Sequence, residues 1–377
     1  MSRSGIIPIG ARLLAITAAL AGAVAVASLA VALFVIAVAV VRGDPMPVFA
    51  PGLPDIEITG CLLLFAAMTL SVATHGWKKS ALRRILSNRD ASTRTDLFYF
   101  ILATSGLMTT AATLATFGAT SGIDAIAKTT TGLGLFAGLP SYVTVPSAFV
   151  VISFSLYWIH RAEHTSLLWP LHAVHHAGKD FNILLFYRRH PAVLVFSSII
   201  LFGLLFLGLP LGAIVTAFLI LRAQSLWAHS DLPTNAFVER WIVFGPRGHG
   251  IHHGSDPNCF NANYGDLVIW DRLFGTYKAD APEPLVYGCA DPDGLYQSGS
   301  PLRDIIAVEK AWLRALSDRL VLGAGARRDE HQPTGRRDDA AVPRALRNDE
   351  GLAGPDRGAL LAAVGLEHDH HLAREQG

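Results

Sequence analysis

Residues 139–176 read LPSYVTVPSAFVVISFSLYWIHRAEHTSLLWPLHAVHH, an apolar segment that runs directly into five histidines. The apolar part, Leu139 to Ile159, is long enough to cross the hydrocarbon core of a bilayer, which takes about 20 residues of α-helix. At its end the spacing of His160 and His164 places both imidazoles on one helix face. The stretch therefore predicts a membrane-spanning helix that carries histidines at the membrane boundary.

Composition extends the membrane interpretation to the whole chain. Of 377 residues, 51% are hydrophobic and only 16% are charged, and the formal net charge is +1. Soluble domains carry about 25% charged residues, and nucleic-acid binders and disordered activators carry a large net charge of one sign. The three cysteines, Cys61, Cys259 and Cys289, form no C-x-x-C pair and cannot all be paired with one another, so the sequence supports neither a disulfide framework nor a thiolate zinc ribbon. Any bound metal must use other ligands.

Three further apolar segments are long enough to span a membrane, giving about four transmembrane helices in all. They are Leu13–Val41, Ile56–Trp77 and Asp96–Thr120. A cleaved signal is the alternative for the first segment, although signal sequences have apolar regions of only about 7–15 residues. Six basic residues between the second and third segments place that loop in the cytoplasm: Lys78, Lys79, Arg83, Arg84, Arg89 and Arg94.

A hydrophobic hairpin is predicted between the histidine-rich regions. Its arms are Ala192–Leu207 and Leu211–Leu221, and Gly208-Leu209-Pro210 forms the turn. At a rise of about 1.5 Å per residue both arms are marginal or too short for a full crossing, so a partly inserted hairpin is expected. The chain then enters and leaves on one side, and the histidine-rich helical lobe that follows, from Ala228 to about Leu320, is predicted to be cytoplasmic.

Ten histidines between residues 160 and 253 form three groups and two single residues. The groups are His160 and His164; His172, His175 and His176; and His249, His252 and His253, while His190 and His229 stand alone. Buried imidazoles in such numbers would lack hydrogen-bond partners, which a transition metal would satisfy. A catalytic zinc needs only three protein ligands, so this number favours a dinuclear site, and imidazole suits iron, zinc, copper and nickel alike. The groups contain no Glu-x-x-His pair, H-E-x-x-H motif or G-x-S-x-G motif, which disfavours carboxylate-bridged, peptidase and esterase sites.

The order H-x-x-x-H, H-x-x-H-H, H-x-x-H-H, with the hairpin between the second and third boxes, resembles the fatty acid hydroxylase and sterol desaturase superfamily. The similarity covers roughly Pro146 to Tyr277. It includes Tyr157-Trp158, Leu168-Trp169, Arg189-His190-Pro191, His229-Ser230, Asn263-Tyr264-Gly265 and the terminal Trp270-Asp271-Arg272-Leu273-Phe274-Gly275-Thr276-Tyr277. Two positions depart from the family pattern: Ala177 stands in place of a small hydroxyl residue, and Asp231 in place of the more usual asparagine.

The resemblance implies an integral-membrane oxygenase with two irons, molecular oxygen and external electrons, which hydroxylates or desaturates a C–H bond of a sterol or fatty acyl lipid. The expected metal ligands are His160, His164, His172, His175, His176, His249, His252 and His253, with His229 as a ninth. For His190 three roles remain open: metal ligand, hydrogen-bond partner of a ligand, or structural residue. Glu163, Asp266 and Asp271 are candidate acceptors for ligand N–H groups, and Asn263 for holding a ligand or making a turn. The alternative for Glu163 is a surface pair with Arg161.

The resemblance also suggests how the chain is divided. We expect an N-terminal transmembrane region (1–145), a catalytic domain (146–290), a C-terminal helical segment (291–322) and a disordered polar tail (323–377), since the composition becomes charged from about Gly323. His190-Pro191 runs into Ala192 and does not form a haem-binding motif, so a separate reductase or electron carrier is implied. No nucleic-acid partner is expected, and the oligomeric state is left open.

Two other functions remain open from the sequence. A zinc-bound histidine cluster could be hydrolytic or structural, because zinc activates water. A metal or proton transporter would need ionisable residues inside several spans, and the spans before Tyr157 have almost none. For location we expect a multi-pass membrane protein with cytoplasmic histidines, in a bacterial inner membrane on its alanine- and arginine-rich composition, or in the endoplasmic reticulum of a eukaryote.

Overall fold

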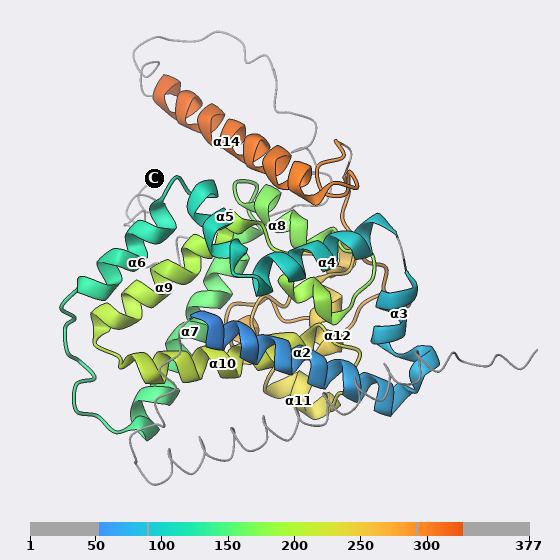
Figure 1. The fold of residues 1–377 in the computed structure, drawn as a ribbon, viewed down its shortest axis with the longest axis horizontal. Helices are drawn as coiled ribbons and strands as arrows, with labels where there is room; N and C mark the ends of the chain where they lie inside the picture. The colour runs from blue at the N-terminus through green and yellow to red at the C-terminus, as the bar shows by residue number, and fades with distance from the viewer. Residues whose placement is uncertain (1–52, 89, 292, 327–377) are drawn as a thin grey trace, which may run out of the picture. The chain divides into compact units, whose positions relative to one another are not determined.

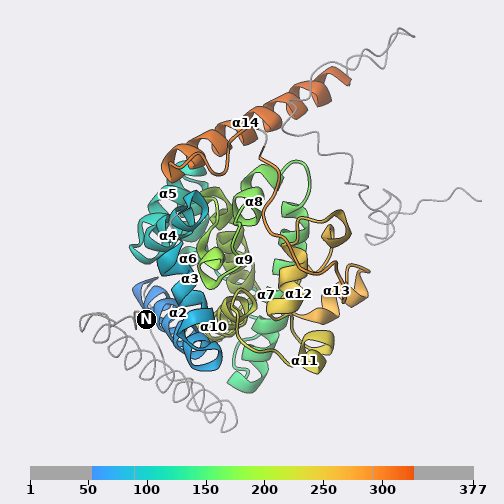
Figure 2. The same ribbon diagram turned by 90° about the vertical axis from the view of Figure 1, so that its right-hand side faces the viewer.

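The computed structural model describes residues 53–88, 90–291 and 293–326. The expected span at Leu13–Val41 and nearly all of the expected tail lie outside these residues. Within them the regular structure consists of helices and two isolated bridges, Val243 with Leu267 and Gly254 with Tyr287. The predicted all-α class is confirmed for the described part of the chain (Figures 1 and 2).

The longer helices form the body of the fold. They are α2 (Leu53–His75), α4 (Ala91–Thr104), α5 (Leu107–Ala115), α6 (Ala119–Thr129), α7 (Ser141–Glu163), α9 (Leu194–Leu207), α10 (Leu211–Ala228) and α14 (Pro301–Ala326). Shorter helices connect them: η1 (Trp77–Lys79), α3 (Ala81–Ser87), α8 (Trp169–His176), η2 (Ile183–Tyr187), η3 (Pro191–Val193), α11 (Ala236–Trp241), α12 (Pro246–His252), η4 (Pro257–Cys259) and α13 (Val268–Leu273).

Two described helices are long and apolar enough to cross a membrane. They are α7, with 23 residues, and α10, with 18. The span predicted at Leu139–Ile159 therefore corresponds to α7.

α10 extends past Leu221, where the hairpin arm was expected to end, because the polar residues beyond that point have partners. Arg222 stacks over the Phe186 ring at 5.5 Å, and Gln224 Nε2 donates to Phe244 O at 2.6 Å. This arm is thus longer than the sequence predicted.

The span predicted at Asp96–Thr120 is not one continuous helix. The structure has two helices there, α4 and α5, bent by 97° at the break between them, so the pair counts at most as one broken span or a re-entrant segment. Gly106 adopts a left-handed φ of 79°, which glycine tolerates because it has no Cβ, and the Ser105 hydroxyl donates to Leu102 O at 3.2 Å. Up to three membrane-span candidates are therefore present among the described residues.

The packing of α7, α9 and α10 fixes the position of the histidines. Small fully buried residues, Ala148 of α7 and Ala217 of α10, let these helices approach closely, and Ile152 and Ile214 fill the space between them. The predicted hairpin turn is confirmed at Gly208, whose φ is 90°. A second core packs α14 against α8 through Val308 and a third packs α2 against η2. As a result the C-terminal ends of α7 and α10 converge with α8 and α12.

Candidate metal centre

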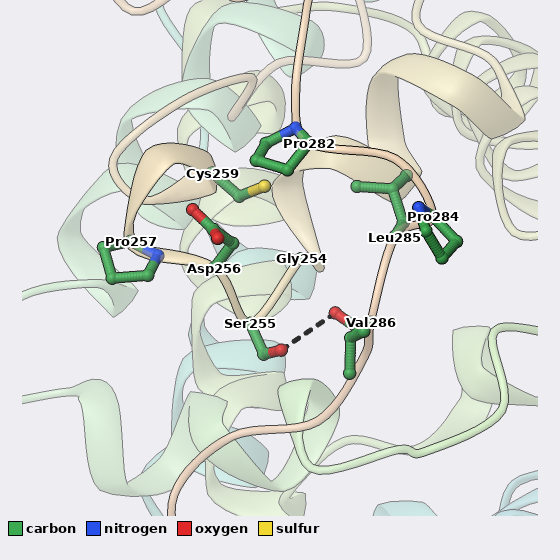
Figure 3. A pocket seen from close by; sticks show the side chains of 9 residues that line it. All are labelled: Gly254, Ser255, Asp256, Pro257, Cys259, Pro282, Pro284, Leu285 and Val286. Carbon is green, nitrogen blue, oxygen red and sulfur yellow. Dashed lines mark hydrogen bonds between the residues drawn. The ribbon is translucent and has the colours of Figure 1, made fainter.

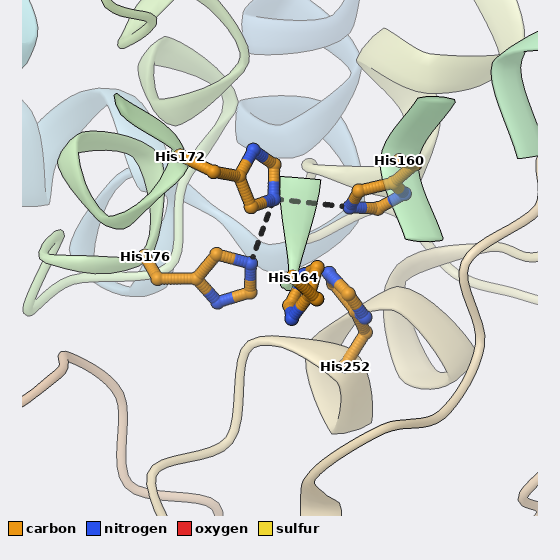
Figure 4. Close-up of side chains that lie close together, drawn as sticks. All are labelled: His160, His164, His172, His176 and His252. Carbon is orange, nitrogen blue, oxygen red and sulfur yellow. Dashed lines mark hydrogen bonds between the residues drawn. The ribbon is translucent and has the colours of Figure 1, made fainter. Parts of the chain in front are cut away.

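Nine histidines lie in two compact groups. Within each group the candidate ligand nitrogens are all within 4.8 Å of one another. Group one contains His160, His164, His172, His176 and His252, and group two contains His175, His229, His249 and His253. Figure 4 shows group one, with His172 between His160 and His176. The groups are adjacent, since the rings of His176 and His253 stack with centroids 4.4 Å apart.

Helical spacing sorts the histidines between the groups. Residues four apart share a helix face, so His172 and His176 of α8 both belong to group one, and His249 and His253 of the α12 region both belong to group two. His175 lies in group two and His252 lies in group one, so each H-x-x-H-H box contributes histidines to both groups.

Local sequence explains why the two short helices form. α8 carries Pro170 in its first turn, where proline's missing N–H costs nothing. α12 forms although it contains Pro246, Gly248 and Gly250. Its N-terminal N–H of Gly248 donates to Glu239 Oε2 at 2.8 Å, and a Cβ on Gly248 would lie 2.4 Å from the Phe244 ring. Glycine is therefore needed there for the third box to pack.

The outward-facing nitrogens of five histidines are held by oxygen acceptors. Nδ1 lies 2.6 Å from Tyr264 O in His160, 3.0 Å from Glu163 Oε2 in His172, 3.1 Å from Leu185 O in His175, 2.7 Å from Ser225 O in His229 and 2.7 Å from Ala262 O in His252. A carbonyl oxygen can only accept, so Nδ1 carries the proton and Nε2 keeps a lone pair. This outer arrangement is typical of metal-binding histidines.

Two pairs of Nε2 atoms meet without being able to form a hydrogen bond. His160 and His172 face each other through Nε2 at 3.1 Å, as do His175 and His229 at 3.3 Å, although all four hold their proton on Nδ1. Two lone pairs at this distance repel. In addition, Nε2 of His164 and Nε2 of His252 are buried with no hydrogen-bond partner. A cation among these atoms would remove both problems, so the residues fit a metal ion in each group.

The electrostatic surroundings keep the imidazoles in the form that binds metal. Burial lowers the pKa of His252 well below its usual range, and the nearby His160 adds to the effect. Burial, followed by the neighbouring His176 and His175, likewise lowers the pKa of His253. Both rings are therefore neutral near pH 7, with lone pairs free for a metal.

The acidic residues named from the sequence have different places. Glu163 is buried against His172, whereas the Arg161 guanidinium donates to the Tyr157 hydroxyl at 3.1 Å, so the surface pair is not formed. Asp271 does not reach a histidine: its carboxylate accepts from the N–H groups of Tyr264 and Gly265, both at 2.8 Å. One peptide thus stands between Asp271 and His160.

Asp266 and Asn263 also act through the backbone. Asp266 Oδ1 accepts from the Ser225 hydroxyl at 2.8 Å, and the carbonyl of Ser225 faces His229. Asn263 adopts a positive φ of 58°, as expected for a turn, and its amide donates to Gly248 O at 3.0 Å and Lys278 O at 2.9 Å. It therefore ties α12 to the segment after α13.

His190 belongs to neither group. Its Nε2 lies 3.1 Å from Ile305 O and 3.6 Å from Glu309 Oε2, both in α14, and its Nδ1 accepts from Ala192 N at 3.3 Å. Burial lowers its pKa to about 4. Of the three interpretations left open by the sequence, this geometry fits a structural residue that joins η3 to α14.

Sequence reasoning missed the aromatic and carbonyl surroundings of the groups. The Tyr264 ring lies 5.1 Å from His164 and 5.7 Å from both His160 and His252, and the Trp169 ring lies 5.3 Å from His164. Both aromatic residues stood in the motifs quoted above, which was the available signal. The carbonyl acceptors have no side-chain signature and could not be found from the sequence.

A pocket of about 340 Å³ adjoins the third box but does not contain the histidines. It is lined by Gly254, Ser255, Asp256, Pro257, Cys259, Pro282, Pro284, Leu285 and Val286 (Figure 3). The Ser255 hydroxyl donates to Val286 O across it at 3.0 Å. The pocket begins at Gly254, next to His253, and none of its lining residues belongs to either group.

Comparison with known proteins identifies the region that carries the histidines. Residues 145–276 match the family model "Fatty acid hydroxylase". The chain is 32% identical over 152 residues to alkylglycerol monooxygenase of Xenopus tropicalis, covering 40% of this chain and 33% of the relative. It is 31% identical over 148 residues to the ornithine lipid hydroxylase OlsE of Rhizobium tropici (38% and 44%), and 28% identical over 137 residues to a probable Delta(7)-sterol 5(6)-desaturase of Neurospora crassa (35% and 38%).

The chain thus spans between a third and a half of the length of these three relatives. No solved structure matches it. All nine grouped histidines lie inside the matched region, and the relatives belong to the superfamily that the three boxes resemble. The sequence resemblance is confirmed: the chain contains a fatty acid hydroxylase domain at residues 145–276.

Proposed function

We propose that this protein is a membrane-bound di-iron oxygenase that hydroxylates or desaturates a lipid C–H bond with molecular oxygen and externally supplied electrons. The observation that carries the proposal is the convergence of nine imidazoles into two adjacent groups, with Nδ1 held by oxygen acceptors in five of them. Five nitrogens in one group and four in the other suffice for two ions. The catalytic domain is proposed at 146–290, after an N-terminal membrane region and before the C-terminal helical segment and tail.

Iron is favoured over zinc by the names of the relatives. A monooxygenase, a hydroxylase and a desaturase are all oxidoreductases, and zinc has no redox chemistry. Iron held by group one and group two would supply the activation of oxygen and the oxidation of the C–H bond. Glu163 and the carbonyls of Tyr264, Leu185, Ser225 and Ala262 fix the tautomer and the direction of their histidines, so the lone pairs are aligned before metal binds.

The location of the site suits a lipid substrate. His160 lies in the last turn of α7 and His229 follows α10, and these are the two described helices long enough to span a bilayer. The histidines are buried or half-buried, which limits access of water to a strong oxidant. We propose that these helix ends and the basic loop around Lys78 share the cytoplasmic side, where a separate reductase or electron carrier would supply electrons.

Substrates named for the relatives guide the first assays. They include an alkylglycerol, an ornithine lipid and sterols, which share a polar head and a long apolar body. We propose a lipid of this kind, with alkylglycerols tested first because several relatives of about 31–32% identity carry that name.

The test begins with metal content. Detergent-purified protein grown with iron should contain about two irons per chain, coordinated by nitrogen in X-ray absorption spectra, and should consume oxygen only when lipid and reductant are both present. His252→Ala should lose most of the activity and bound iron while keeping membrane insertion, and His190→Ala is the matched histidine control. Tightly bound zinc that iron cannot replace, in protein that consumes no oxygen, would support the hydrolytic or structural alternative instead.

A further inference from the structure

The surface formed by α11 and α13 carries large apolar side chains with no protein partner covering them among the described residues. Exposed fractions are 65% for Phe237 and 51% for Trp241 of α11, and 50% for Ile269 and 64% for Leu273 of α13, with Ile242 at 50% beside them. We call these five residues and the two flanking arginines, Arg240 and Arg272, the α11–α13 face. An exposed apolar surface of this kind usually marks an interaction site.

The two helices form one unit. Val268 N donates to Ile242 O at 3.1 Å, and Arg272 donates to Arg240 O at 2.8 Å. The guanidinium of Arg272 also lies between two rings, 4.1 Å from the centre of Trp241 and 4.0 Å from that of Tyr277. The face is therefore held in a fixed shape.

Contacts with α7 set the depth of this unit relative to the membrane. Trp270 of α13 donates its indole N–H to the Ser153 hydroxyl at 3.2 Å and packs edge-on against Phe154 at 5.2 Å. Ser153 lies about 15 Å before the C-terminal end of α7, at a rise of 1.5 Å per residue. α13 is thus beside the apolar part of α7, whereas a fully aqueous lobe would lie beyond its end.

The acidic and basic residues of α11 and α13 lie on opposite sides of the unit. The acidic residues of the two helices face inward: Glu239 is buried against Gly248 N, and Asp271 is fully buried against the backbone of Tyr264 and Gly265. Arg240 and Arg272 are exposed. The outward side therefore offers apolar groups and positive charge, the combination that binds at the surface of an anionic bilayer. Tryptophan and arginine at this level also fit the interfacial belt of membrane proteins.

We infer that the α11–α13 face is immersed in the cytoplasmic interface of the bilayer, with Arg240 and Arg272 bound to anionic lipid head groups. The inference rests on α7 crossing the membrane, as proposed above, and not on the reaction. A series of aromatic contacts runs from α13 toward the histidines. Phe274 stacks on Tyr157 at 5.2 Å, Tyr157 contacts Tyr264 at 6.2 Å, and the Tyr264 ring adjoins His160. This series of rings connects the end of α13 to group one.

The test uses spin labels on the full-length, metal-free protein in lipid vesicles. The native cysteines are replaced by alanine, and single labels are placed through Ile269→Cys and Leu273→Cys. Val150→Cys on α7, where the side chain is 47% exposed, is the lipid-facing control, and Asp280→Cys, at a side chain 95% exposed, is the aqueous control. Collision rates with oxygen, which concentrates in lipid, and with a water-soluble nickel complex are measured by electron paramagnetic resonance.

Labels on the face should resemble Val150→Cys, with high oxygen and low nickel accessibility. A pattern like that of Asp280→Cys would overturn the inference. Low accessibility to both reagents would also overturn it, since the face would then be covered by protein, either the apolar segment at 13–41 or a second copy of the chain. If Val150→Cys itself is aqueous, α7 does not span, and the proposed membrane arrangement fails with it.

Head-group binding is tested by lipid composition. Adding phosphatidylglycerol to phosphatidylcholine vesicles should raise the oxygen-to-nickel ratio at Ile269→Cys, and Arg240→Gln should abolish that increase. Arg314→Gln, which removes an exposed cation on α14, is the matched control and should preserve it. An equal ratio in the two kinds of vesicle would refute the binding of anionic head groups while leaving the test of immersion intact.

Discussion

Removing the carboxylate of Glu163 should weaken one metal site and leave the other intact. Glu163 Oε2 lies 3.0 Å from His172 Nδ1, and 9% of Glu163 and 8% of His172 are exposed. A hydrogen bond to a charged group is worth about 1.5–3 kcal/mol, and tenfold in affinity corresponds to about 1.4 kcal/mol. The expected loss is therefore about 10- to 100-fold in affinity at group one, in the range known for outer partners of metal ligands.

The assay is a titration of metal-free protein in detergent with Co²⁺, followed by its visible absorption in competition with a chelator. The unaltered protein should bind two ions per chain. In Glu163→Ala one binding step should weaken by the stated factor, because His172 serves group one alone. Glu163→Gln should lose less, since its amide oxygen still accepts from Nδ1. Glu283→Ala, at an exposed glutamate, is the control and should match the unaltered protein.

Equal weakening of both steps in Glu163→Ala would refute the division of the histidines into two sites. No weakening of either step would refute the role of the carboxylate in holding His172. A variant that retains its thermal unfolding midpoint but shows one weakened step is the result that a purely structural role for Glu163 would not give.

Three further results are expected. His175→Ala should lower bound iron by about one per chain in elemental analysis, whereas His190→Ala should leave it unchanged because that ring lies in neither group. Arg188→Met should lower the free energy of unfolding, measured with denaturant, by about 3–5 kcal/mol, because it removes the guanidinium that lies 2.9 Å from the buried carboxylate of Asp96. Replacing Asp96 by asparagine in the same variant should restore part of that stability, and no recovery would contradict this account. Cutting the chain after Ala326, which keeps α14 whole, should leave lipid-dependent oxygen consumption unchanged, and a large loss would show that the remaining tail takes part in activity.

Long apolar runs made parts of the fold predictable. α7 and the turn at Gly208 follow from hydrophobicity and from a helix-breaking trio, both of which are local properties. The bend between α4 and α5 was missed because threonine, serine and glycine within an apolar run are compatible with a straight membrane helix. The extension of α10 was missed because Gln224 is satisfied by the carbonyl of Phe244, a partner distant in sequence.

The site shows the same division between local and distant information. The histidines stand out because they are numerous and recur at helical spacings of three and four residues, so the nine residues later found in two groups could all be named beforehand. Their outer partners depend on tertiary packing. Asp231 illustrates this: the sequence marked it only as a departure from a family pattern, whereas in the structure its carboxylate accepts from Ser71 Oγ at 2.9 Å and Ala81 N at 2.8 Å. It thereby joins α2 and α3 to the loop that follows His229.

The H-x-x-H-H box itself encodes two sites. Successive residues of an α-helix diverge by about 100°, so the two adjacent histidines of a box cannot direct their rings at one ion, whereas residues four apart can. α8 therefore gives two histidines to group one and one to group two, and the α12 region gives the reverse. The pairs face each other, with ring centroids 4.5 Å apart for His175 and His253 and 4.7 Å for His176 and His252. Because each helix serves both groups, the ring contacts between α8 and the α12 region would set the spacing of two ions held there, and a change that shifts one helix is expected to alter both groups together.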